Sequence, residues 1–145
     1  MRFMLIVKAS ADSEAGKMPS MEMLEEMGKF NEEMVKAGVM LAGEGLQASS
    51  KGAKVKFVPG QKPVAVDGPF AETKELIAGF WLIQVKSKEE AIAWALRSPN
   101  PHGPDKETEI EIRQVFDPTD FGPEIAESEQ ALRDEIAKNQ LKTRS

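Results

Sequence analysis

Residues 66–75, VDGPFAETKE, hold the densest group of side chains able to do chemistry in this sequence. Asp67 and Glu72 are two carboxylates close in the chain, and two carboxylates can divide acid and base work when their environments differ. Lys74 can lower the pKa of a neighbouring carboxylate or bind an anion itself. The pattern predicts Asp67 and Glu72 as catalytic residues, with Phe70 and Lys74 as ligand-binding residues.

The same stretch is also typical of a tight turn. Asp accepts backbone hydrogen bonds at the start of a turn, Gly adopts unusual φ angles, and Pro fixes φ at the next corner. A structural turn would therefore explain Asp67, Gly68 and Pro69 without any reaction.

Glu44, Trp81 and Arg113 complete the predicted ligand-binding residues. Glu44 is flanked by glycines, which either let a ligand approach the backbone or mark a bulge. Glu111 and Arg113 lie two apart on one strand face, so they either line the same cleft as Glu44 or form a surface ion pair. Trp81 either floors an apolar pocket or packs in the core.

No metal site and no cofactor are expected. The chain has no cysteine, which excludes disulfides, thiolate nucleophiles and Cys-ligated zinc. His102 is the only histidine and lies in a loop rich in Pro and Gly. We interpret it as an exposed loop residue, the alternative being a general base. Phosphate-binding loops, nucleophile elbows and HExxH zinc motifs are absent.

Composition indicates one soluble globular domain, because 41% of the 145 residues are hydrophobic and 30% are charged. The net charge of −5 argues against a nucleic-acid binder, which needs a concentrated basic face. The chain has no run near the roughly 18 apolar residues of a membrane span. Its apolar start, residues 3–7, is too short for a signal peptide. A cytoplasmic location is expected.

The pattern of apolar residues and turns predicts an α+β fold in which a hairpin is inserted between two strand-helix-strand halves. Without the hairpin and a C-terminal helix, this order is the ferredoxin-like βαββαβ plan. The predicted strands cover 3–7, 39–46, 78–85 and 108–116, the hairpin arms 54–58 and 63–66, and the helices 20–38, 87–97 and 124–142.

Each of the first two helices has a predicted apolar face. In the first helix it consists of Leu24, Met27, Phe30, Met34 and Val35. In the second helix it consists of Ala91, Ile92, Ala95 and Leu96, which places Trp94 away from the centre of that face.

The strands at 3–7 and 78–85 are apolar on both faces, yet two helices can cover only one face of the sheet. A second copy of the chain would bury the other face through a two-fold contact. The alternative is that the C-terminal helix folds back over the sheet. Its apolar stripe is narrow, which favours a homodimer.

Four segments together resemble the YCII-related family, and more narrowly its branch named for the DGPF motif. They are LAGEGL at 41–46, VDGPFAETKELIAGFWLIQV at 66–85, EEAIAWA at 89–95 and EIEIRQVF at 109–116. The resemblance implies a domain over residues 1–122 with a helical tail over 123–145. It also implies a dimeric α/β barrel, the fold of a superfamily whose members are mostly homodimers.

The resemblance brings two functional expectations. Relatives carry a His and Asp pair suspected of catalysis; Asp67 would supply the Asp, whereas no strand histidine matches. Genes of the branch often neighbour extracytoplasmic-function sigma factors, which implies an association with sigma-factor regulation.

Three functions follow as hypotheses. The first is a homodimer that binds or senses an unknown small molecule. The second is a cofactor-independent enzyme, resembling an isomerase, lyase or monooxygenase, with Asp67 or Glu72 as general base and Lys74 or Arg113 holding an anionic substrate. The third is an interaction module that contacts a sigma factor through the C-terminal helix.

Overall fold

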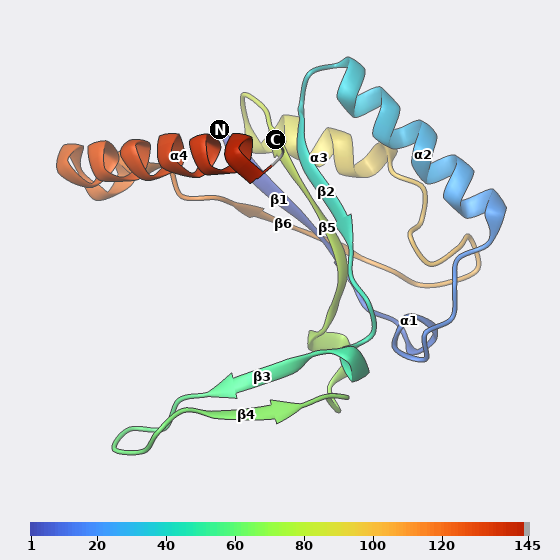
Figure 1. Ribbon diagram of the computed structural model, residues 1–145. Coiled ribbons are helices and arrows are strands. Elements are labelled where there is room, and N and C mark those ends of the chain that lie inside the picture. The colour runs from blue at the N-terminus through green and yellow to red at the C-terminus, as the bar shows by residue number, and fades with distance from the viewer. Residues whose placement is uncertain (144–145) are drawn as a thin grey trace. The chain divides into compact units, whose positions relative to one another are not determined.

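The computed structural model describes residues 1–143, with side chains described as far as Leu141 (Figure 1). Two compact units make up the chain, Met1–Gln114 and a second that begins at Val115. The strands are β1 Arg2–Lys8, β2 Met40–Gly45, β3 Ala53–Lys56, β4 Val64–Asp67, β5 Ile77–Gln84 and β6 Ile110–Gln114. The helices are α1 Ala11–Glu14, α2 Met21–Lys36, α3 Lys88–Arg97 and α4 Pro123–Thr143.

The first unit contains a four-stranded antiparallel sheet in the order β2-β5-β1-β6. The two central strands, β1 and β5, are the strands predicted from their double-sided apolar pattern. With α2 between β1 and β2, and α3 between β5 and β6, this is the ferredoxin-like arrangement. The predicted α+β fold is confirmed.

The predicted hairpin is also confirmed. β3 and β4 form a separate two-stranded sheet in which Ala53 pairs with Asp67 and Lys56 with Val64. Figure 1 shows this hairpin standing apart from the four-stranded sheet. Since no third strand joins it, every residue of both strands stays exposed.

One face of the four-stranded sheet holds the core. Ser20 begins α2 by accepting a hydrogen bond from the Met23 backbone N–H, and Ser87 caps α3 in the same way through Glu90. Both helices cover this face. The buried side chains are Phe3, Leu5 and Val7 from β1, Trp81 and Ile83 from β5, Phe30 and Met34 from α2, Ala91 and Trp94 from α3, and the loop residues Val39 and Val85.

The apolar face predicted for α2 is too wide. Phe30 and Met34 are buried and Met27 packs against the core, but Leu24 and Val35 are 48% and 62% exposed. Only a narrow strip of the helix contacts the sheet, so residues at the two sides of the predicted face remain in solvent.

The face predicted for α3 is rotated relative to the observed one. Trp94 is buried, whereas Leu96 is 80% exposed. Phe30 of α2 supplies the neighbour that Trp94 lacks on its own helix, with ring centroids 6.4 Å apart. Arg97 covers the indole ring at 4.3 Å. Burying the large indole against Phe30 outweighs burying the smaller Leu96.

The second face of the sheet carries the alternate residues of the central strands. Met4 and Ile6 of β1, with Phe80 and Leu82 of β5, are half-buried there. Two of their cross-strand neighbours at the edges are acidic: Glu44 lies opposite Phe80 in β2, and Glu111 lies opposite Ile6 in β6.

The second unit consists mainly of α4, where a helix was predicted. Phe116 and Phe121 contact each other before the helix, with ring centroids 4.9 Å apart. The apolar stripe of α4 is exposed along its length, at Ile125, Leu132, Ile136 and Leu141. Within residues 1–143, no helix combines the length and apolarity needed to cross a membrane.

Candidate functional site

The turn that follows β4 is held through its backbone. A Cβ atom on Gly68 would lie 1.8 Å from the carbonyl oxygen of Ser49, so only glycine permits this approach. The Phe70 backbone N–H donates to Ser49 Oγ at 3.1 Å. Ser49 in turn donates to the Glu14 carboxylate through its backbone N–H at 3.0 Å and through its hydroxyl. The turn is therefore tied to α1.

The charged side chains of this turn take no part in those bonds. Asp67 ends β4 opposite Ala53 and is exposed. Glu72 and Lys74 belong to the short 3-10 turn around Thr73–Glu75 and are also exposed. The structural interpretation of the turn explains Gly68 and the Phe70 amide, but it gives the Asp67 carboxylate no backbone partner within residues 1–143.

A small cleft of about 480 Å³ lies between the hairpin and the DGPF turn. Phe70 and Glu72 line it together with Lys54, Lys56 and Glu75. Lys54 Nζ stands 4.2 Å from the centre of the Phe70 ring, a cation–π distance. Two ammonium groups and two carboxylates thus face one small space, where they can bind a charged group of a ligand. Asp67 and Lys74 do not line this cleft.

A larger cleft of about 1040 Å³ lies beside the N-terminal half of α2. It covers the end of the sheet where β1 and β2 finish and β5 begins, and the loop 99–106 closes another side. Glu44 and Trp81, two of the predicted ligand-binding residues, line it. Met23 and Met27 of α2 also line it and, with Trp81, give the cleft an apolar surface.

Trp81 is a core residue and a wall of the larger cleft at once. Its ring contacts Phe30 edge-on, with centroids 5.6 Å apart, and only 6% of the residue is exposed. Its indole N–H donates to Asn31 Oδ1 of α2 at 2.8 Å. Both interpretations of Trp81 therefore apply to the same side chain.

Two residues that the sequence did not identify as site residues, Asn31 and His102, also line the larger cleft. His102 is half-buried rather than exposed, and its Nε2 atom lies 2.6 Å from the Lys8 carbonyl oxygen. The backbone N–H of His102 donates to Asn100 Oδ1 at 3.1 Å, which holds the loop. These contacts join residues 94 and 2 positions apart in sequence. No local pattern could have revealed the first of them.

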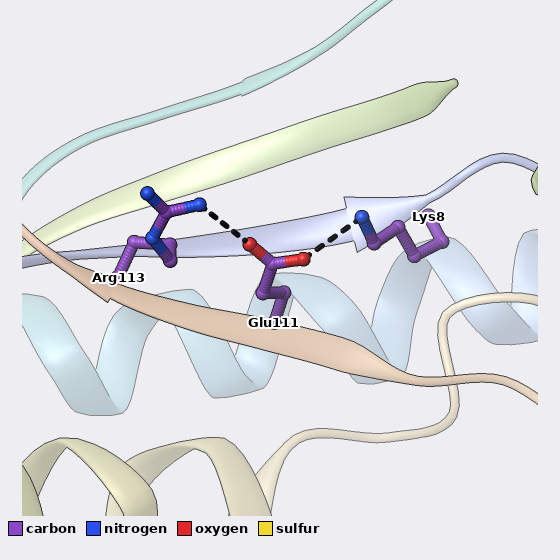
Figure 2. A network of polar contacts seen from close by, with 3 residues as sticks. All are labelled: Lys8, Glu111 and Arg113. Atoms are coloured by element: carbon purple, nitrogen blue, oxygen red, sulfur yellow. Dashed lines mark hydrogen bonds and ion pairs between the residues drawn. The ribbon is translucent and has the colours of Figure 1, made fainter. Parts of the chain in front are cut away.

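Arg113 lies elsewhere, on the second face of the sheet at the β6 edge. Figure 2 shows Glu111 between two cations: Lys8 Nζ at 3.0 Å and Arg113 Nη1 at 3.2 Å. Hydrogen bonds from Lys8 and then from Arg113 hold the pKa of Glu111 below its ordinary value. The ion-pair interpretation of Glu111 and Arg113 is the observed one, and Arg113 lines neither cleft.

The predicted site residues therefore do not converge on one place. Phe70 and Glu72 share the small cleft, Glu44 and Trp81 share the larger one, and Asp67, Lys74 and Arg113 lie outside both. Within the part of the chain that the structure describes, no three His, Asp or Glu side chains gather as a metal site requires.

Comparison with known proteins connects this chain to one family. The profile of the YCII-related domain matches residues 1–117. An uncharacterised protein of Rhizobium meliloti (strain 1021) is 32% identical over 80 residues, which are 54% of this chain and 64% of that relative. The chain thus spans about 64% of the length of this curated relative.

Proposed function

The chain belongs to the YCII-related domain family, and we propose that it is a cytoplasmic homodimer of the DGPF branch that binds a small organic molecule. The observation that carries the proposal is the larger cleft beside α2. Its volume of about 1040 Å³ reaches the upper part of the range of small-molecule sites, which are concave and mostly apolar with a few polar groups.

The walls of the larger cleft suit an adaptable ligand site. The Met23 and Met27 side chains are half-buried, and methionine can rearrange around ligands of different shape. Trp81, which lines the same cleft, is fixed by Phe30 and Asn31. One rigid aromatic wall and one flexible wall favour binding over a purely structural role.

Methionine labelling tests the proposal directly. The chain has 8 methionines, of which Met18, Met23 and Met27 line the larger cleft. In protein labelled with ¹³C at the methionine methyl groups, a screen of water-soluble aromatic fragments should shift the NMR signals of Met23 and Met27. The signal of Met34, which is fully buried, should stay in place.

The pattern of shifts decides where binding occurs. A shift of Met4 without Met23 would place the ligand on the second face of the sheet instead. A screen of several hundred fragments in which neither Met23 nor Met27 moves would contradict the proposal.

The homodimer is supported by the second face of the sheet. Met4, Ile6, Phe80 and Leu82 form a continuous apolar strip there, and the helices of the first unit cover only the opposite face. A second copy would bury this strip by a two-fold contact. Association with a sigma factor, which the resemblance to the DGPF branch implies, would use the exposed apolar stripe of α4.

The small cleft supports a second candidate, a cofactor-independent enzyme acting on an anionic substrate. Lys54 and Lys56 line the same space as Glu72, so a carboxylate able to accept a proton lies near two cations that can hold an anion. In this proposal Glu72 is the general base. Asp67 would contribute only if a ligand draws the turn closer, and Lys74 and Arg113 would not touch the substrate.

Comparing two substitutions tests the enzyme. Once a substrate is found, Glu72→Gln should abolish turnover while leaving the melting temperature unchanged, because Glu72 is exposed. Asp67→Asn is the matched control and should retain turnover. Loss of turnover in Asp67→Asn alone would contradict this assignment.

A further inference from the structure

We propose that the larger cleft selects non-anionic ligands that carry a hydrogen-bond acceptor and a hydroxyl donor on an apolar body. Asn31 would donate to the acceptor, and His102 would accept from the hydroxyl. The inference rests on the proposed function, because it names the ligand class of the same cleft.

The orientation of the Asn31 amide follows from its partner. An indole N–H can only donate, so the atom of Asn31 that lies 2.8 Å from Trp81 Nε1 must be the amide oxygen. The amide nitrogen, with two N–H groups, is then the atom left for a ligand. Within residues 1–143 it has no hydrogen-bond partner of its own. Asn31 therefore offers a donor.

The tautomer of His102 follows from the same reasoning. A backbone carbonyl can only accept, so His102 Nε2, at 2.6 Å from the Lys8 oxygen, carries the proton. In the neutral ring the other nitrogen, Nδ1, then has a free lone pair. No protein group among the described residues bonds to it. His102 therefore offers an acceptor.

The charges around the larger cleft disfavour an anionic ligand. Four carboxylates line it, those of Asp12, Glu22, Glu26 and Glu44. Only two ammonium groups do so, those of Lys17 and Lys106. An anion would meet an excess of negative charge. The remaining wall, formed by Met23, Met27 and Trp81, is suited to an apolar body.

Three matched probes separate the two hydrogen bonds on wild-type protein. 6-Acetyl-2-naphthol carries a ketone acceptor and a hydroxyl donor, 2-naphthol lacks the ketone, and 2-acetylnaphthalene lacks the hydroxyl. Titrations should show 6-acetyl-2-naphthol binding about five- to tenfold more tightly than either analogue. The Met23 and Met27 methyl signals should report the binding.

Two substitutions assign each preference to its residue. Asn31→Asp keeps an acceptor for Trp81 but loses the donor, so the preference over 2-naphthol should disappear. His102→Lys keeps a donor for the Lys8 carbonyl but carries no acceptor, so the preference over 2-acetylnaphthalene should disappear. Asn139→Asp, the same change on α4, should leave all three affinities unchanged.

The outcomes separate this inference from the proposed function. If all three probes shift Met23 and Met27 with affinities within twofold of one another, the cleft binds but the ligand class is wrong. If no probe shifts these signals, this inference fails, while the proposed function is decided by the wider fragment screen. The comparison of the three probes needs only wild-type protein. It can therefore refute the inference even if one of the variants does not fold.

Discussion

Ser49 and Gly68 show what the DGPF turn does at the level of single residues. The Ser49 carbonyl approaches Gly68 closely, and the Ser49 hydroxyl links the Phe70 amide to the Glu14 carboxylate. These contacts use backbone atoms and one hydroxyl. The motif residues with charged side chains are therefore free to serve another purpose, while its glycine is required by packing.

Substituting that glycine should destabilise the protein. Gly68→Ala would place a Cβ atom 1.8 Å from a backbone oxygen, so the chain must shift and lose the Ser49 contacts. We expect a loss of more than about 2 kcal/mol in the free energy of unfolding, measured by urea denaturation. Gly28→Ala is the matched control, because Gly28 lies inside α2 with open space around it.

The two alanine variants should change the free energy of unfolding in opposite directions. Gly28→Ala should raise the stability by up to about 1 kcal/mol, because alanine favours a helix interior. If Gly68→Ala were as stable as wild type, the close approach at Ser49 would not constrain the turn.

The Glu111 ion pairs predict a pH dependence of stability. Lys8 and Arg113 lower the pKa of Glu111 in the folded protein below 4.5, so this carboxylate stabilises the fold at higher pH. The contribution is complete above the unfolded pKa and is lost as the pH falls through the folded pKa. Wild type should therefore exceed Glu111→Gln in stability at pH 6.

The gap between wild type and Glu111→Gln should close as the pH falls from 4.5 toward 3. Added salt should narrow it at pH 6, because the groups are partly exposed and screened. A gap that stays constant over this pH range would mean that the ionised carboxylate is not the stabilising species.

At the scale of elements, the sequence predicted every strand and the three longer helices. The central strands were identifiable because both of their faces are apolar, and the hairpin because a Pro-Gly turn separates two alternating runs. The orientation of the helices was harder to predict. Helical periodicity favours Leu96 over Trp94, but the choice is made by Phe30, a residue on another helix.

The candidate site was less predictable than the fold. Sequence proximity suggested that Asp67, Glu72 and Lys74 act together, yet only Glu72 lines the small cleft. The larger cleft depends on pairs such as Trp81 with Asn31, 50 positions apart. Such pairs arise only when the helix is docked on the sheet.

Two alanine substitutions test which face of α3 is buried. Trp94→Ala should reduce the free energy of unfolding by about 3–5 kcal/mol, because it removes a buried ring. Leu96→Ala should change it by less than about 0.5 kcal/mol, because Leu96 is 80% exposed. Thermal or urea unfolding measures both changes. A larger cost for Leu96→Ala would mean that this face of α3 is covered by a partner.

At the scale of the whole molecule, the proposed homodimer would bury the second face of the sheet. A proposed homodimer should give a light-scattering mass of twice the 16.0 kDa of one chain. Ile6→Glu should convert it to the monomer, because the substitution places a charge in the apolar strip. Removing residues 123–145 should leave the dimer intact.

Two results would contradict the dimer. One is a mass of 16.0 kDa for wild type at micromolar concentration. The other is aggregation after removal of residues 123–145, which would show that the C-terminal helix covers the sheet.

The dual position of Trp81 limits how this protein can diversify. The same ring packs in the core and lines the larger cleft. Substitutions of Trp81 should therefore destabilise the fold even where no ligand is bound. New specificities should instead arise at Met23, whose half-buried side chain lines the cleft without being packed against the core. Directed evolution of the pocket would therefore begin on one side of it.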